Sequence, residues 1–117
     1  MGTVDDLVER LTATLTELQV LFDDVGEDAW HAWVRDCLRL IGRGDARGLR
    51  KVRGAFGGMG SLNDVIIHPA NGHRLPPGDV GRVNLRLDDL RTRLFDGVVA
   101  LQRQLGSPGN SERTGSD

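Results

Sequence analysis

Apolar residues recur at intervals of three and four positions through most of this chain, which is the spacing of one face of an α-helix. The pattern predicts three long helices and one short helix, over residues 3–24, 27–42, 45–53 and, from a start between 79 and 84, to 105. Because each apolar stripe needs another helix to cover it, we expect a small helical bundle of the mainly α class.

Residues at the predicted helix ends agree with this division. Thr3 is a typical N-cap for the first helix, and Gly26 is expected to end it. Asp45 is the expected N-cap of the short helix. Trp30 and Trp33 fall on the apolar stripe of the second long helix, and we expect them to contribute the largest share of the buried apolar area.

Length and composition indicate a single domain. The chain has 117 residues, of which 38% are hydrophobic and 27% charged, as is typical of globular proteins. Residues 1–105 are expected to form one helical domain. Residues 106–117 offer nothing to bury and are predicted to be a disordered C-terminal tail.

Charge and targeting signals narrow the class of protein. A net charge of −2 gives no bulk attraction to nucleic acid or to an anionic membrane, so neither is an expected partner. The N-terminus is acidic, unlike a signal peptide, and no apolar run reaches the roughly 18 residues of a membrane span. One cysteine cannot form an internal disulfide. These features favour a cytoplasmic protein.

A glycine-rich segment follows the short helix, and core packing does not explain it. The candidate binding residues in and after this segment are Gly57, Gly58, Met59, Gly60, Ser61, Asn63, Asp64 and His68. Successive backbone N–H groups in such a loop can bind an anion, and the polar side chains can bind a polar partner. The same residues also suit a tight structural turn in which those side chains cap local backbone. The segment is neither a P-loop nor a dinucleotide-binding turn, so no cofactor is expected.

Two features follow the glycines. The β-branched triplet 65–67 predicts a short extended segment that needs a pairing partner, in another chain or within residues 73–83. His68 and His73 lie near Asp64 and raise the question of a metal site. Their spacing does not place them on one helix face, so solvated loop histidines are the favoured interpretation and no metal is expected.

Cys37 lies on the apolar stripe of the second helix, which predicts a buried and inert thiol rather than a nucleophile. No catalytic residue is assigned.

Residues 35–53 are strongly basic, with seven Lys and Arg against two Asp. Residues 1–28 carry eight acidic side chains against one Arg, so we expect the acidic first helix or a partner protein to neutralise the basic stretch.

Residues 56–64, Phe-Gly-Gly-Met-Gly-Ser-Leu-Asn-Asp, resemble the FGGMGS(F/L)ND signature of a family of short, uncharacterised bacterial proteins, a domain of unknown function. The resemblance covers about residues 10–105, and only the nine signature residues are specific. It implies helices, a glycine loop, an apolar triplet and a closing helix in a bacterial cytoplasmic protein. It implies no mechanism.

A small domain with segregated charges and no catalytic constellation favours a non-enzymatic protein-binding module. Such an immunity-type or accessory module would bind a bacterial protein through the glycine loop. The alternative is a small-ligand or phosphate-binding domain in which the loop amides form the anion site. A helical homo-oligomer stays open, since an apolar stripe that the bundle leaves uncovered would mark an interface.

Overall fold

The computed structural model describes residues 3–57 and 59–106. This part of the chain contains four α-helices and no strands, which confirms the mainly α fold of three long helices and one short helix. The helices are α1 (Val4–Val25), α2 (Asp28–Gly42), α3 (Arg47–Gly54) and α4 (Val80–Gly106). Three single-turn 3-10 helices, which the sequence did not predict, lie between α3 and α4: η1 (Leu62–Asp64), η2 (Pro69–Asn71) and η3 (Pro77–Asp79). The predicted disordered tail, apart from Gly106 at the end of α4, lies outside the described residues.

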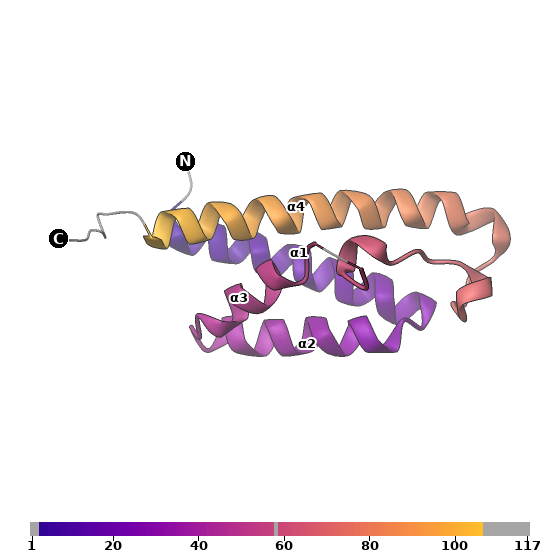
Figure 1. Ribbon diagram of the computed structural model, residues 1–117, viewed down its shortest axis with the longest axis horizontal. Helices are drawn as coiled ribbons and strands as arrows, with labels where there is room; N and C mark the ends of the chain where they lie inside the picture. The colour runs from indigo at the N-terminus through magenta and orange to yellow at the C-terminus, as the bar shows by residue number, and fades with distance from the viewer. Residues whose placement is uncertain (1–2, 58, 107–117) are drawn as a thin grey trace.

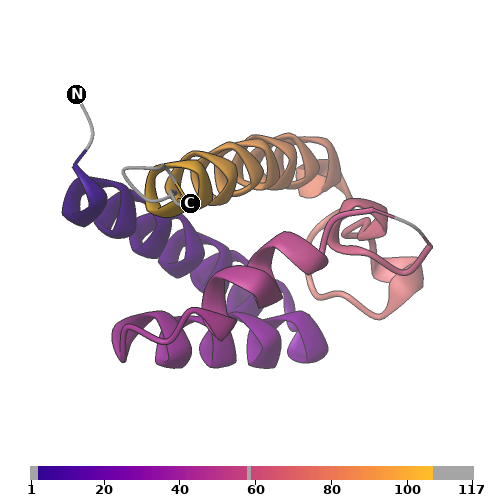
Figure 2. The ribbon, with the colours of Figure 1, turned by 60° about the vertical axis from the view of Figure 1, so that its left-hand side comes forward.

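The four α-helices form a ring of pairwise contacts. Helices α1 and α4 lie side by side and antiparallel, and α2 packs along α1 on the side away from α4 (Figure 1). Helix α3 crosses obliquely from the end of α2 to α4 and closes the ring (Figure 2). The irregular segment 55–79 then returns the chain to the start of α4, so it lies beside α4 and away from the N-terminal half of α1 (Figure 1).

The first helix ends as the sequence predicts. The Thr3 hydroxyl accepts the Asp6 N–H at 3.1 Å, and the Asp6 carboxylate accepts the Thr3 N–H at 3.4 Å, which is a complete capping box. Gly26 ends α1 with φ +72°, a left-handed conformation that glycine adopts without strain.

At the start of α3, the predicted N-cap Asp45 lies one residue too early, because Ala46 occupies the N-cap position. Its carboxylate accepts the backbone N–H of Arg47, and hydrogen bonds from Arg47 lower the pKa of Asp45 to about 2.

The core is mainly aliphatic, and the expectation that the tryptophans contribute the largest share of the buried apolar area stays a prediction. Trp30 and Trp33 are partly buried against this core and pack edge to face, with ring centroids 5.2 Å apart. Phe22 is the largest fully buried side chain. Buried leucines of α1 and α4 pack where these two helices meet. They are Leu11, Leu15, Leu18, Leu87, Leu90, Leu94 and Leu101. Helix α2 packs mainly against α1 and α3, and the tryptophans lie at the margin of the buried core.

Gly48, in the first turn of α3, lies where this helix packs closely against α2. A Cβ atom at this position would lie 2.8 Å from Ile41 Cγ1 and 3.0 Å from the Ile41 backbone nitrogen. Cβ atoms essentially never come as close as 2.8 Å to another heavy atom, a Cβ contact of 3.0 Å is tighter than most, and the backbone nitrogen cannot yield without moving α2. The absence of a side chain therefore sets the close approach of α2 and α3.

We expect Gly48→Ala to lower the free energy of unfolding by about 1 kcal/mol, although alanine is the better helix former. Helix propensity favours alanine by at most about 1 kcal/mol in this first turn, and overpacking against Ile41 costs about 1–3 kcal/mol. Urea denaturation measures the difference. Gly54→Ala is the matched control, because a Cβ there meets nothing within 4 Å and should be neutral or stabilising. Equal stabilisation by both substitutions would contradict the close α2–α3 contact.

Candidate functional site

The glycine segment forms an exposed loop that a carboxylate closes. Gly57 has φ +106° and Gly60 has φ +78°, conformations that residues with a side chain rarely adopt, so glycine is needed at both positions. The Asp64 carboxylate accepts the Gly60 N–H at 2.7 Å. Asp64, a predicted binding residue, therefore uses one carboxylate oxygen to hold the loop itself.

The end of the loop is anchored in the core. Leu62 is fully buried, and its N–H donates to the Ala55 carbonyl at 2.8 Å. Ser61, just before it, is 9% exposed, and its hydroxyl has no hydrogen-bond partner among the described residues. A hydroxyl that is buried in this way is withdrawn from the surface, so Ser61 contributes to the anchor rather than to the face of the loop.

Arg91 of α4 holds the segment that follows the loop. One terminal nitrogen of its guanidinium, Nη1, donates to the Leu62, Asn63 and Val65 carbonyls at 3.0, 3.3 and 2.9 Å. The other, Nη2, pairs with the Asp88 carboxylate one turn away on α4. Only 11% of the Arg91 side chain is exposed. The planar fork of an arginine can reach several acceptors at once, which a lysine ammonium does less well.

A groove of about 610 Å³ lies between the glycine loop, the end of α3 and α4. Phe56 and Phe95 meet edge to face in it, with centroids 5.2 Å apart and ring planes at 70°. The Arg53 guanidinium carbon lies 4.9 Å from the centroid of the Phe95 ring, within range of a cation–π contact. The complete lining is Arg53, Phe56, Gly57, Asn63, Asp88, Arg91, Thr92, Phe95 and Asp96. The groove thus combines an aromatic floor with charges of both signs, and two predicted site residues, Gly57 and Asn63, lie in it.

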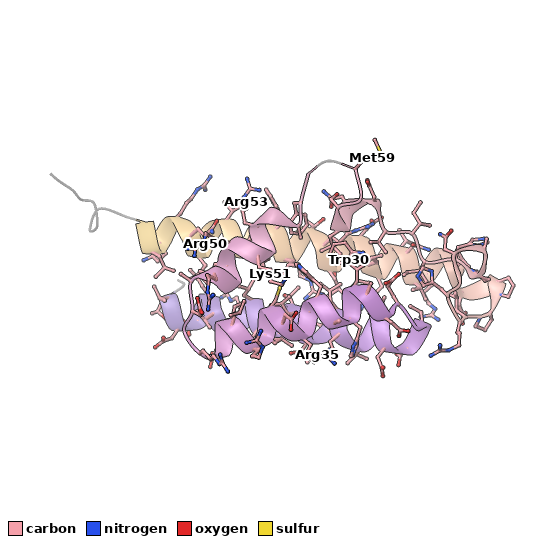
Figure 3. The ribbon with its side chains drawn as sticks, turned by 60° about the horizontal axis from the view of Figure 1, so that its bottom comes forward. Trp30, Arg35, Arg50, Lys51, Arg53 and Met59 are labelled. Carbon is pink, nitrogen blue, oxygen red and sulfur yellow. The ribbon has the colours of Figure 1, made fainter. Side chains whose placement is uncertain are left out.

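Met59 is the most exposed apolar side chain near the groove. It is 100% exposed and projects away from the helices at the tip of the loop (Figure 3). A thioether that remains in water gains nothing from folding, and methionine is over-represented at protein-binding surfaces. Gly58, the remaining predicted loop residue, lies outside the described residues.

His68 does not join the loop residues. It is exposed, and its Nδ1 accepts the Ala70 N–H at 2.9 Å, which caps η2. The backbone N–H of His68 donates to Nδ1 of His73. Among the described residues, no hydrogen bond connects the His68 side chain to Gly57, Met59 or Gly60, so His68 serves the turn that follows.

His73 is not a solvated loop histidine, contrary to the prediction. It is 8% exposed, and its Nδ1 accepts the His68 N–H at 3.0 Å, which assigns the ring hydrogen of the neutral form to Nε2. Nε2 lies 2.8 Å from Glu27 Oε1, so it donates to that carboxylate. The second oxygen of Glu27 accepts the Trp30 N–H and caps α2. Glu27 therefore joins the start of α2 to a segment 46 residues further along the chain.

Of the two expected sources of neutralisation for the basic stretch 35–53, the first helix supplies none, since no ion pair in the described part of the chain joins α1 to that stretch. Glu17 of α1 pairs instead with Arg86 and Arg93 of α4. Within the basic stretch, Arg39 and Arg47 pair locally with the two aspartates of that stretch. Among the acidic side chains that α1 contributes to the described structure, Glu17 forms the ion pairs to another helix, and both of its partners are on α4.

Cys37 is fully buried, as predicted. Burial raises the pKa of its thiol to about 12, with the Lys51 ammonium opposing the shift in part. A thiol with that pKa is almost entirely protonated near neutral pH and is a poor nucleophile. Cys37 therefore acts as a packing residue.

Two general features of the described residues bear on function. No group of three or more His, Cys, Asp or Glu side chains among them is placed to hold a metal ion. None of the helices in the same part of the chain combines the length and apolarity that a membrane span requires.

Part of the chain is similar in sequence to a protein family of unknown function. Residues 23–76 match a family described as "Domain of unknown function (DUF6966)". The matched stretch runs from the end of α1 through α2 and α3 to the residues before η3, and it contains the positions of the glycine loop. No curated protein and no solved structure matches the chain. The similarity thus supports a small uncharacterised domain and assigns no activity.

Proposed function

We propose that this protein is a non-enzymatic protein-binding module whose glycine loop inserts Met59 into an apolar pocket of a partner protein. The full exposure of Met59 beside the aromatic groove carries the proposal. An exposed methionine can bury its whole side chain on binding, and interface energy concentrates in a few such anchors. The module belongs, in this proposal, to a bacterial cytoplasmic protein of immunity or accessory type.

The rigid base of the loop supports this use. Arg91, Leu62 and the Asp64–Gly60 bond fix both the loop and the segment that follows it. A partner therefore meets a base of the loop that is already ordered, and loses less free energy in ordering the backbone around Met59. Next to the anchor, Asn63 and the edge of Phe56 offer one polar and one apolar contact within the groove.

The alternative, an anion site made by the loop amides, meets an electrostatic obstacle. The Asp64 carboxylate already accepts the Gly60 N–H at 2.7 Å, so it occupies the position that a phosphate oxygen would take. A phosphate brought to the same amide would also be repelled by that carboxylate. Ser61, which would assist an anion, has a buried hydroxyl.

The test compares binding by Met59→Asp and by a matched surface variant. The full chain is immobilised, the main protein captured from a bacterial cytoplasmic extract is identified and purified, and its dissociation constant is measured by calorimetry. Met59→Asp should weaken binding by about tenfold or more, because it places a charge in the apolar pocket. Leu85→Asp, at a residue that is 72% exposed on α4, is the control and should leave binding unchanged.

Equal affinity of the purified partner for both variants would overturn the assignment of Met59. A thermal-shift series with inorganic phosphate and nucleotides tests the alternative directly. A ligand at 100 times its dissociation constant adds about 2.7 kcal/mol, which raises the melting temperature of a domain this small by several degrees. Such a rise, lost in Gly60→Ala, would replace the protein-binding proposal with the anion site.

A further inference from the structure

The outer sides of α2 and α3 carry a cluster of positive charges, separate from the glycine loop. We call this surface the basic face, and its residues are Arg35, Arg39, Arg43, Arg47, Arg50 and Lys51. Arg35, Arg50 and Lys51 lie on the side of the molecule formed by α2 and α3 (Figure 3). On α2, the arginines recur every fourth position opposite the buried Val34, Cys37 and Ile41, so they point to solvent.

The basic face has few counter-charges of its own. Asp36 lies 3.8 Å from Arg39, and Asp45 lies 2.7 Å from Arg47. Within residues 3–57 and 59–106, no ion pair engages Arg35, Arg43, Arg50 or Lys51. In this part of the chain, the exposed Arg35, Arg43 and Arg50 and the partly exposed Lys51 therefore remain without an ion pair.

The rest of the chain has the opposite charge. Residues 35–53 contain seven of the fifteen Lys and Arg and two of the seventeen Asp and Glu, which is a formal +5 in a protein whose remainder carries −7. The acidic side chain that pairs between helices, Glu17, is engaged by Arg86 and Arg93 on α4. Folding thus leaves the positive charge concentrated on α2 and α3 instead of cancelling it.

We propose that the basic face binds an acidic segment of a partner protein. Arg35, Arg39 and Arg43 are spaced about 6 Å apart along α2, from four residues at 1.5 Å each. Carboxylates at every fourth position of a helix, or at every second position of a strand, have nearly the same spacing. Arginine forks pair with carboxylates through two parallel hydrogen bonds, so the match is geometric as well as electrostatic.

A compact acidic segment fits this surface better than a nucleic acid does. A long polyanion would extend beyond the basic face onto a remainder that carries −7, where it would be repelled. No aromatic side chains are interleaved with the arginines between residues 35 and 53 to stack against bases. A short acidic segment would contact only the cations of the basic face and would avoid this repulsion.

The test titrates the full chain with a glutamate peptide of about ten residues, a length that spans the α2 arginines. Backbone NMR shifts should cluster at residues 35–51, and the affinity should fall steeply as salt rises. The triple variant Arg35→Gln, Arg43→Gln and Arg50→Gln should bind the peptide about tenfold more weakly. The matched control changes Arg82, Arg86 and Arg103 of α4 to glutamine, which alters net charge equally, and it should lose less than about threefold.

Three outcomes would overturn the proposal. Equal loss in both triple variants would mean that only net charge matters. Tighter binding of a single-stranded oligonucleotide of equal charge, lost in the first triple variant, would assign the face to nucleic acid. Salt-sensitive self-association that the same variant abolishes would assign it to the acidic side of a second copy. Met59→Asp should leave peptide binding intact, so this result and the fate of the glycine-loop proposal are separable.

Discussion

Replacement of Asn84 by alanine is expected to lower the free energy of unfolding by about 3 kcal/mol. The side-chain amide accepts the Ile67 N–H at 2.9 Å and donates to the Ile67 carbonyl at 2.8 Å. It also donates to the Val80 carbonyl within α4. Ile67 is fully buried, so alanine leaves two of its backbone groups without partners, and each such group costs about 1–3 kcal/mol. Urea denaturation monitored by circular dichroism measures the change.

Two further variants isolate the cause. Asn84→Asp keeps an oxygen for the Ile67 N–H but turns a second oxygen toward the carbonyls, so it should be no more stable than the alanine variant. Asn71→Ala removes one exposed bond, to the Ile66 carbonyl, and should cost no more than about 1 kcal/mol. If Asn84→Ala and Asn71→Ala prove equally mild, the bonds to Ile67 do not hold the segment to α4.

The second large effect is expected for Arg91→Met, which keeps much of the length of the side chain and removes its charge. Hydrogen bonds from charged groups contribute about 1.5–3 kcal/mol each, and three that share one donor nitrogen are not additive, so we expect a loss of about 3 kcal/mol. The loss should be accompanied by faster amide hydrogen exchange at residues 60–65 than in the helices. Mass-spectrometric exchange resolves that difference.

Arg93→Met is the matched control for Arg91→Met. The Arg93 side chain is 44% exposed and pairs with Glu17 and Asp89, and exposed ion pairs contribute about 0–1 kcal/mol. Arg91→Lys should lie between the two, because an ammonium keeps the charge but not the planar fork. Similar stability of Arg91→Met and Arg93→Met would show that the carbonyl contacts contribute little.

The helices were predictable because a local pattern defines them. Apolar spacing and end signals predict each helix end to within two residues, except the start of α4, for which the pattern gives a range of 79–84 that contains the observed Val80. The links that organise the rest join residues far apart: Asn84 to Ile67 across 17 positions and His73 to Glu27 across 46. A lone polar residue carries no periodic signal, so these contacts had no trace in the sequence. His73 therefore read as a loop residue, although it is buried.

The candidate site shows the same division. The glycines indicated an exposed turn, and Gly57 and Gly60 adopt the left-handed backbone that glycine favours. The direction of each side chain was not predictable: the Asp64 carboxylate turns back to Gly60, and the Ser61 hydroxyl turns inward. The expectation that the acidic first helix neutralises residues 35–53 is wrong for a similar reason. A count of charges along the chain does not reveal that α1 presents Glu17 to α4.

The β-branched triplet 65–67 has a consequence for association between chains. An extended segment with free backbone groups is a template on which another chain can add a strand, the first step of many aggregates. Here each carbonyl of the triplet is bound by a side chain, Val65 by Arg91, Ile66 by Asn71 and Ile67 by Asn84. Those three side chains occupy the carbonyl acceptors that an added strand would need, which disfavours β-pairing by a segment of high β-propensity in which Ile66 is 61% exposed.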